Sequence, residues 1–307
     1  MTVTMTTSRL MSKPLSEQRN RIIGVSGGIF TVETSDGEVS ARSRGVFRQK
    51  GIKPVPGDYV ELLFEENAQP VITEVCPRTS LLVRPPLANL DMAILVVSSC
   101  EPKPNPFILD KLTAIFESKG IETVFAFTKT DMAEVEQLVS VYSAIGYKTF
   151  MINNLTGEGT DGITEYISGK TAALIGNTGV GKSSLMNYIA PAVLHKTSEI
   201  SKKLGRGRHT TRDVRFYRLE NGTYIADTPG FSTVEISRYG DIPSAEVISC
   251  FREFGEYTEG CRFKDCAHIK EADCSLREAV SSGMIALSRY DSYCKLYSEA
   301  VQTENTY

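Results

Sequence analysis

The sequence predicts an α/β protein with a doubly wound, mostly parallel sheet, preceded by a small β-barrel and followed by a mostly helical segment. Three observations support this fold class. Residues 91–98 form a continuous apolar run of the kind that is buried on both faces of a parallel sheet. Strand and helix patterns alternate from residue 89 onward, whereas five short strand patterns crowd residues 21–75. After residue 230 the strand patterns fade, and two helical stretches flank a group of cysteines.

Size and composition limit the possible organisation. The chain has 307 residues, of which 41% are hydrophobic and 23% charged, so it can bury a substantial core and form two or three domains. We expect domains at residues 1–86, 87–236 and 237–307. The net charge of -3 gives no global sign of nucleic-acid binding. Neither a signal region nor a membrane span is recognisable, so we expect a cytoplasmic protein with no membrane partner. Separately, we expect a monomer.

The strand patterns of the barrel are short and separated by turn signals. They cover residues 21–25, 28–32, 38–42, 59–64 and 69–75. Five such strands predict a small closed barrel, for which the OB-fold is the best-known case. Strand count alone leaves an SH3-type barrel open.

The barrel also carries a basic stretch with no acid between Glu38 and Asp58. A barrel face of this charge suits RNA, with Phe30 and Phe47 as candidates for stacking on bases. The basic residues are Arg42, Arg44, Arg48, Lys50 and Lys53.

The α/β region predicts helices over 107–119 and 134–145 and from 184 onward. Strands are expected over 122–127, 147–152 and 170–175, and a hairpin joins 214–219 to 223–226. Repeated strand–helix–strand units imply parallel pairing.

A glycine-rich loop follows the strand at 170–175 and precedes a helix. The pattern Gly176-x-x-x-x-Gly181-Lys182-Ser183 in this context is that of a phosphate-binding loop. Backbone N–H groups converge on the phosphates, Lys182 reaches the β- and γ-phosphates, and Ser183 is a magnesium ligand. The residues expected to bind nucleotide here are Gly176, Asn177, Thr178, Gly179, Val180, Gly181, Lys182 and Ser183.

Two further segments complete a phosphate-sensing site. In Asp227-Thr228-Pro229-Gly230, the aspartate can hold magnesium through water and the N–H of Gly230 can meet the γ-phosphate. A threonine between the two loops should reach the magnesium when the γ-phosphate is present. We expect Thr211, with Thr210 as the alternative.

A base-reading segment ends the strand at 122–127. Asp131 can accept from both N1–H and the exocyclic amine of guanine, a pair of donors that adenine lacks. The segment consists of Thr128, Lys129, Thr130 and Asp131. Lys129 can lie along the base, and Thr128 offers a hydroxyl where asparagine is commoner. Asn153 opens the loop that would back the base, although an ordinary loop fits it equally well.

The motifs occur in an unusual order, because the base-reading segment precedes the phosphate loop. In a Ras-like domain the phosphate loop comes first. The α/β region is therefore predicted to be a circularly permuted P-loop GTPase domain, which uses GTP with magnesium and releases GDP and phosphate. Phe231 occupies the place where many GTPases have a glutamine that orients the attacking water, so unaided hydrolysis should be slow. His209 is the nearest catalytic candidate, although an inert or RNA-contacting histidine fits equally well.

Two flanking features point to partners. Residues 201–218 hold seven basic side chains against one acid, which favours an RNA-facing surface over a merely solvated loop. Three thiolates and one imidazole near the C-terminus can close a tetrahedral zinc site, one structural ion per chain, although four unrelated buried residues remain an alternative. The ligands would be Cys261, Cys266, His268 and Cys274, with Cys250 in reserve.

These motifs together resemble those of the RsgA family of bacterial ribosome biogenesis GTPases. The resemblance rests on the permuted order, on Gly-Arg-Gly-Arg-His-Thr-Thr-Arg at 205–212, on Asp-Thr-Pro-Gly-Phe at 227–231 and on Cys-Arg-Phe-Lys-Asp-Cys-Ala-His at 261–268. It implies an OB-fold, a permuted GTPase domain and a zinc domain. It also implies binding to the small ribosomal subunit and its rRNA late in subunit maturation, with hydrolysis stimulated by that subunit. By position, residues 128–131 and 176–184, including Ser184, would bind GTP.

We therefore expect a GTPase that docks on ribosomal RNA and is released by GTP hydrolysis. The first alternative is a nucleotide-gated RNA-binding scaffold whose hydrolysis is incidental, which Phe231 favours. The second is a P-loop ATPase or kinase, which Asp131 disfavours.

Overall fold

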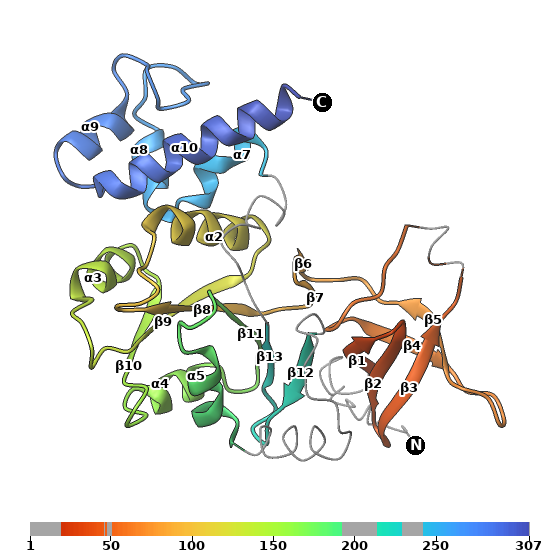
Figure 1. Ribbon diagram of the computed structural model, residues 1–307. Coiled ribbons are helices and arrows are strands. Elements are labelled where there is room, and N and C mark those ends of the chain that lie inside the picture. Colours follow the sequence, from red (N-terminus) through yellow and green to blue (C-terminus); the bar gives the residue numbers. More distant parts are fainter. Residues whose placement is uncertain (1–19, 46, 48–50, 192–213, 229–241, 307) are drawn as a thin grey trace, which may run out of the picture. The chain divides into compact units, whose positions relative to one another are not determined.

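The computed structural model describes residues 20–45, 47, 51–191, 214–228 and 242–306 (Figure 1). Contacts between residues divide the chain into two compact units, Met1–Pro77 and Arg78–Tyr307. The first unit thus ends before residue 86, where we placed the first boundary. The three-domain division, with its second boundary after residue 236, stays a prediction.

Five strands form a closed barrel in the first unit. They are β1 (Asn20–Ser26), β2 (Ile29–Thr34), β3 (Gly37–Ser43), β4 (Tyr59–Leu63) and β5 (Val71–Val75). They pair in the order β1-β2-β3-β5-β4, and β4 returns to β1 to close the barrel. The β3–β5 pair is parallel and the others are antiparallel. This strand order is that of an OB-fold, as predicted.

The barrel interior is filled by alternating apolar side chains. Both Phe30 and Phe47, which we expected to stack on bases, belong to this core and are 6% and 5% exposed. That prediction was wrong, because Phe30 points inward from β2 and Phe47, which lies between β3 and β4, packs into the same core. Arg42 and Arg44 are exposed, whereas Arg48 and Lys50 lie outside the described residues.

The second unit contains the predicted doubly wound sheet. Its strands are β8 (Met92–Ser98), β9 (Glu122–Thr128), β10 (Lys148–Ile152), β11 (Thr171–Ile175), β12 (Arg215–Arg218) and β13 (Tyr224–Asp227). The spatial order is β10-β9-β8-β11-β13-β12. All neighbours are parallel except the β12–β13 hairpin. β8 is buried along its whole length, as its unbroken apolar run predicts.

Helices cover both faces of this sheet (Figure 1). On one face, α4 (Thr160–Tyr166) and α5 (Lys182–Ile189) pack their apolar residues against β8, β9, β11 and β13. On the other face lie α2 (Pro106–Ser118) and α3 (Glu136–Ala144), where the Tyr142 ring stacks on Phe125 with centroids 4.2 Å apart. Asn105 caps α2, and Pro106 stands in its first turn, which needs no backbone N–H donor.

Some elements were not predicted from the sequence. These are α4 and a short hairpin of β6 (Leu81–Val83) and β7 (Pro86–Ala88). Both are too short for a clear periodic pattern; α4 also contains Gly162, a poor helix former.

The C-terminal part of the second unit is mostly helical, as expected. It consists of α7 (Ser244–Val247), η3 (Ile248–Cys250), η4 (Arg252–Phe254), α8 (Gly255–Thr258), α9 (Ser275–Ser281) and α10 (Leu287–Glu304). We call residues 242–306 the C-terminal module. Within the described ranges, no helix is both long and apolar enough to cross a lipid bilayer.

A buried ion-pair network joins the C-terminal module to α2. Arg289 of α10 is 1% exposed, and its guanidinium donates to Asp110 of α2 at 2.7 Å and to Glu253 at 2.6 Å. Tyr142 donates to the same oxygen of Asp110 at 2.8 Å. Burial alone would lower the pKa of Arg289, but the two carboxylates outweigh it and raise this pKa, so the guanidinium stays charged.

More exposed pairs surround this network. Arg252 donates to Glu117 of α2 at 2.5 Å and lies over the Tyr147 ring, while Glu299 of α10 pairs with Lys111 of α2. One helix, α2, thus faces the sheet on one side and the module on the other.

Replacing Arg289 by methionine should destabilise the protein by about 3–5 kcal/mol, because it leaves the buried Asp110 carboxylate without its partner. Chemical denaturation of the purified variant measures this. As a matched control, Glu299→Gln removes a half-exposed ion pair at the same interface and should cost about 1 kcal/mol at most. Equal costs for the two variants would contradict the role given to Arg289.

Candidate functional site

The candidate site lies at the carboxyl edge of the parallel sheet. Register brings the strand ends together, since Thr128 of β9 pairs with Ser98 of β8 and with Ile152 of β10. The loops that follow β8, β9, β10 and β11 therefore emerge side by side. Open α/β sheets bind ligands at this edge.

The glycine-rich loop runs from the end of β11 to the start of α5, as predicted. Gly181 precedes α5 with φ of 101° in the left-handed region, where a side chain would strain the backbone. A Cβ atom there would also lie 2.4 Å from Nδ2 of Asn154. The loop thus passes directly against the segment that follows β10.

Lys182 and Asp227 are the charged groups beneath this loop. The Lys182 ammonium donates to the carbonyls of Gly176 at 2.6 Å and Asn177 at 3.0 Å. Burial lowers the pKa of Lys182 and raises that of Asp227, and each charge partly offsets the shift of the other. Oδ1 of Asp227 is buried without a hydrogen-bond partner among the described residues. An orphaned carboxylate oxygen below a phosphate loop fits an aspartate that orders magnesium-bound water.

Other predicted residues of this loop lie at the start of α5. Ser183 is exposed, as a magnesium ligand must be, and Ser184 is half-buried behind it. Thr228, which follows Asp227, is buried and donates to the Leu174 carbonyl at 2.5 Å, fixing the end of β13 to β11.

Thr128 connects the base-reading segment to the glycine loop. Its side chain is fully buried, and its hydroxyl faces the carbonyls of Val180 at 2.5 Å and Val97 at 3.2 Å. The single hydroxyl hydrogen is therefore committed to backbone carbonyls. We expected this hydroxyl to contact the base, whereas it holds the glycine loop against β8 and β9.

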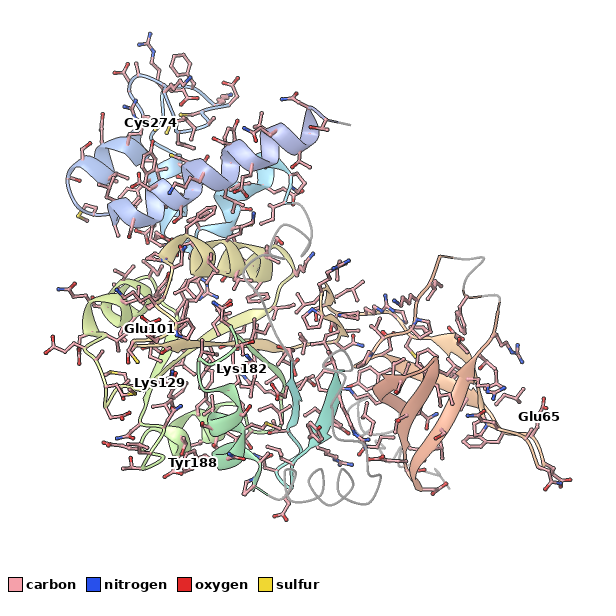
Figure 2. The ribbon with its side chains drawn as sticks, in the orientation of Figure 1. Glu65, Glu101, Lys129, Lys182, Tyr188 and Cys274 are labelled. Carbon is pink, nitrogen blue, oxygen red and sulfur yellow. The ribbon has the colours of Figure 1, made fainter. Side chains whose placement is uncertain are left out.

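Lys129 and Asp131 are more accessible than Thr128. Lys129 has φ of 58°, and its ammonium donates to the Glu101 carbonyl at 2.5 Å, while Ser99 donates to the Lys129 carbonyl at 2.6 Å. Figure 2 shows Glu101 and Lys129 close together. Thr130 is half-buried and Asp131 exposed, so the Asp131 carboxylate is open to a ligand.

The loop after β10 is held in place from two sides. Asn153 accepts from the N–H groups of Leu155 at 2.9 Å and Thr156 at 3.2 Å, so its side chain closes the loop that we expected to back the base. Tyr188 of α5 donates to the carbonyls of Asn154 and Leu155, and its ring covers Gly157, where a Cβ would lie 2.5 Å from it.

Sequence reasoning missed two residues of this loop region. Asn154 lies against Gly181, and its Oδ1 is buried without a partner among the described residues. Asn154 could have been predicted as a site residue, because it stands two residues after the end of β10, at the edge where such sheets bind ligands. Tyr188, labelled in Figure 2, belongs to no sequence motif, and it contacts the loop only because the chain folds α5 against that loop.

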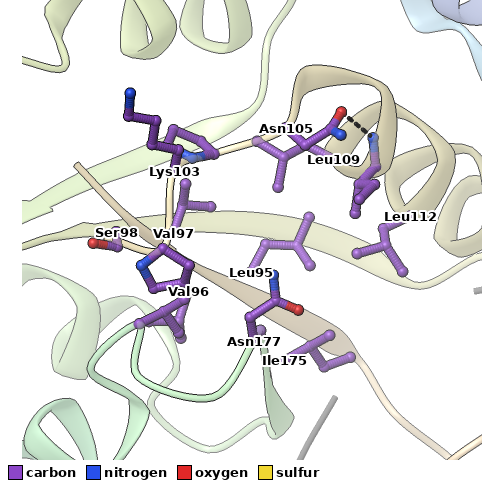
Figure 3. Close-up of a pocket in the computed structure, with 15 residues that line it drawn as sticks. Leu95, Val96, Val97, Ser98, Lys103, Asn105, Leu109, Leu112, Ile175 and Asn177 are labelled. Carbon is purple, nitrogen blue, oxygen red and sulfur yellow. Dashed lines mark hydrogen bonds between the residues drawn. The ribbon is translucent and has the colours of Figure 1, made fainter. Parts of the chain in front are cut away.

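A mostly apolar pocket lies beside the glycine loop (Figure 3). Its lining comes from the end of β8, the start of α2 and the first residues of the loop. Asn177 and Val180 of the loop line it together with Leu95 of β8 and Ile108 of α2. The pocket thus borders both the phosphate loop and the first turns of α2.

The remaining predicted site residues lie outside the described residues. They are His209, Thr210, Thr211, Gly230 and Phe231, together with the basic side chains of residues 201–213. Their expected roles stay predictions.

A second candidate site is the cysteine and histidine cluster of the C-terminal module. Ligand atoms of Cys261, Cys266, His268 and Cys274 all lie within 4.8 Å of one another. Nδ1 of His268 is 3.3 Å from the sulfur of Cys274 and 3.4 Å from that of Cys261. A tetrahedral zinc with ligand bonds of about 2.0–2.3 Å requires separations of roughly 3.5–3.8 Å. The two His268–sulfur separations are close to this range, and three thiols with one imidazole are the donor set of a structural zinc with no open position.

The surroundings of this cluster support the same interpretation. Burial lowers the pKa of His268, against the opposing charge of Glu271, which favours the neutral imidazole that a metal needs. Glu271 accepts three backbone N–H groups of the ligand loop. Tyr290 and Tyr293 of α10 donate to the carbonyls of His268 and Ala267 at 2.7 and 2.8 Å. Cys250, the reserve ligand, lies elsewhere, with its thiol 3.4 Å from the Glu246 carbonyl.

Comparison with family models gives two matches. Residues 75–237 match the model described as RsgA GTPase, and residues 20–72 match the RsgA N-terminal domain.

Curated relatives align over nearly the whole chain. A protein named small ribosomal subunit biogenesis GTPase RsgA, from Caldanaerobacter subterraneus subsp. tengcongensis, is 43% identical over 93% of this chain and 97% of its own. One of the same name from Thermotoga petrophila is 39% identical over 92% of this chain and 96% of its own.

Two solved structures are also similar to this chain over most of its length. YjeQ from Thermotoga maritima has a TM-score of 0.76 at 34% identity, covering 92% of this chain and 98% of its own. YloQ, described as a circularly permuted GTPase, has a TM-score of 0.74 at 30% identity, covering 93% and 96%.

Replacing Cys266 by serine should remove the metal and lower the stability of the C-terminal module, because only three of four zinc ligands remain. Elemental analysis is expected to find one zinc per wild-type chain and less in the variant, with a lower melting temperature. Cys76→Ser in the barrel is the control and should leave the zinc content unchanged. If the purified wild-type protein contains no zinc, the assignment of these four residues as zinc ligands is wrong.

Proposed function

The chain belongs to the RsgA GTPase family, and from this premise we propose that it acts in small ribosomal subunit biogenesis as a switch that GTP hydrolysis turns off. In this proposal the GTP-bound protein docks on the subunit and its rRNA late in maturation. Hydrolysis then drives its release. We expect it to work as a monomer in the cytoplasm.

One observation carries the nucleotide part of the proposal. The base-reading segment after β9 and the phosphate loop after β11 are joined by the contact between the Thr128 hydroxyl and the Val180 carbonyl. Two loops whose contacting residues are 52 positions apart in sequence thus form one continuous surface, which suits a ligand with a base at one end and phosphates at the other.

The phosphate end follows from the chemistry of the loop. Backbone N–H groups at the start of α5 and the Lys182 ammonium would hold the β- and γ-phosphates, with Ser183, Asp227 and Thr211 directed to magnesium. Bound magnesium would offset the developing negative charge. Water would attack the γ-phosphorus and lose a proton to solvent while the bond to the β-phosphate oxygen breaks. GDP would leave with that electron pair, and inorganic phosphate would be the second product. His209 is our candidate for orienting the water.

The base end follows from Asp131. Its exposed carboxylate stands next to Lys129, whose ammonium donates to the Glu101 carbonyl. A carboxylate here accepts from two donors of guanine and meets a ring nitrogen acceptor in adenine. We therefore assign GTP, not ATP, as the substrate.

The contacts of α2 support the release step. Glu101, which accepts from Lys129 and from Ser98 at 2.9 Å, lies just before α2, and the far side of α2 carries the C-terminal module through Asp110. A change at the base-reading segment would therefore reach the module through one rigid helix. The barrel and the module are the surfaces that we expect to meet rRNA.

A scaffold whose hydrolysis is incidental is the competing function. Phe231 favours it, because phenylalanine cannot hydrogen-bond the attacking water. The two functions differ in whether the partner accelerates the reaction.

Purified small ribosomal subunits should raise the rate of GTP hydrolysis well above that of the protein alone, because Phe231 cannot orient the attacking water and the subunit would make up for this. Phosphate release at saturating GTP, with and without subunits, measures this, and Lys182→Ala should remove the stimulated rate. Large subunits serve as the control. An unchanged rate with small subunits would leave the scaffold as the better description.

Replacing Asp131 by asparagine should reduce GTP affinity by about tenfold or more, since a charge-assisted pair of hydrogen bonds is lost. Competition binding with GTP and ATP checks both affinity and preference. Asp161→Asn on the exposed start of α4 is the matched control. If the preference for GTP survives in Asp131→Asn, the guanine assignment is wrong.

A further inference from the structure

The side-chain amide of Asn154 lies where the base and phosphate loops meet. A Cβ atom on Gly181 would lie 2.4 Å from Nδ2 of Asn154 and 3.4 Å from the Thr128 hydroxyl, so the amide and the hydroxyl face the same point of the phosphate loop. The amide makes no hydrogen bond to any residue that the structure describes, and its Oδ1 is buried. An amide held in this way has its hydrogen-bonding capacity available for a ligand.

The neighbouring hydroxyl cannot supply a donor to the base. Thr128 is fully buried, and its one hydrogen faces the carbonyls of Val180 and Val97. Where asparagine occupies this position, its amide has two N–H hydrogens and can serve both the loop and a ligand. With threonine, the contact with the loop remains and the donor to the base is missing.

The position of the amide selects one atom of the base. A purine is joined to ribose and phosphates through N9 of its five-membered ring, so this ring lies nearest the phosphate loop. N7 is the acceptor on the outer edge of that ring. A donor beside Gly181 therefore meets N7.

We propose that Asn154 binds the guanine base through a hydrogen bond from its amide to N7, and so supplies from the loop after β10 the donor that Thr128 lacks. This inference rests on the proposed function, because it requires GTP in the site. It makes Asn154 an affinity-determining residue. Selection of guanine over adenine stays with Asp131, since both purines carry N7.

The loop that carries Asn154 is built to hold it still. Tyr188 donates to the Asn154 carbonyl at 3.3 Å and to the Leu155 carbonyl at 3.0 Å, from a helix that begins at Lys182. Asn153 closes the loop from the other side through Leu155 and Thr156. The phosphate-loop helix and the Asn154 loop therefore move together, which favours a single well-placed hydrogen bond.

The test compares GTP with 7-deaza-GTP, in which a C–H group replaces N7. Wild-type protein should bind GTP about tenfold more tightly than 7-deaza-GTP, the typical value of one hydrogen bond. Asn154→Ala should lower GTP affinity by a similar factor and should bind the two nucleotides equally. Calorimetry or fluorescence competition with the full chain measures all four affinities. If Asn154 had only a structural role, its replacement would weaken the binding of both nucleotides equally. The ratio of the GTP affinity to the 7-deaza-GTP affinity would then stay at its wild-type value.

Asn187→Ala, which removes an exposed asparagine on α5, is the control and should keep the wild-type preference for GTP. If wild-type protein binds GTP and 7-deaza-GTP equally, the contact with N7 does not exist, whatever the variant does. A preference that persists in Asn154→Ala overturns the assignment to this residue. If wild-type protein binds no GTP at all, the proposed function itself fails.

Discussion

Parallel pairing of five neighbouring strands is the constraint on which the rest of the second unit depends. In the order β10-β9-β8-β11-β13 every neighbour is parallel, so every following loop leaves from one edge of the sheet. The phosphate loop, the base-reading segment and Asp227 meet there because of strand register, not because of their order along the chain. This explains how a permuted sequence can build the same site: hydrogen-bonded neighbours are kept, and only the connections change.

Permutation also decides what is attached to the sheet. The C-terminal module is held on α2 by Arg289, a buried charge that pairs with Asp110 and Glu253. A buried ion pair adds little net stability compared with an apolar contact of the same size, but it penalises any arrangement that leaves a charge unpaired. The network therefore favours one docking geometry of the module on α2. This helix begins beside the nucleotide loops.

In both candidate sites, side chains hold the loops in place through hydrogen bonds to backbone groups. In the nucleotide site, Thr128 and Tyr188 connect loops through hydroxyl-to-carbonyl contacts, and Asn153 closes its own loop. In the metal cluster, Glu271 gathers three backbone N–H groups while Tyr290 and Tyr293 hold two carbonyls. Each of these hydrogen bonds gives a partner to a backbone group that an irregular segment would otherwise leave without one. The ligand-facing side chains are thereby positioned before any ligand arrives.

Sequence alone determined the barrel, the parallel sheet, the permuted motif order and the three cysteines and one histidine that cluster, because strand periodicity, glycine loops and cysteine spacing are local patterns. Tertiary structure decided the rest. It placed Phe30 and Phe47 in the barrel core, turned the Thr128 hydroxyl toward Val180, and brought Asn154 and Tyr188 into the site. It also buried Arg289 against Asp110, 179 residues away. Such contacts join segments that are distant in the chain, so which partner a side chain meets is settled only when strands and helices pack.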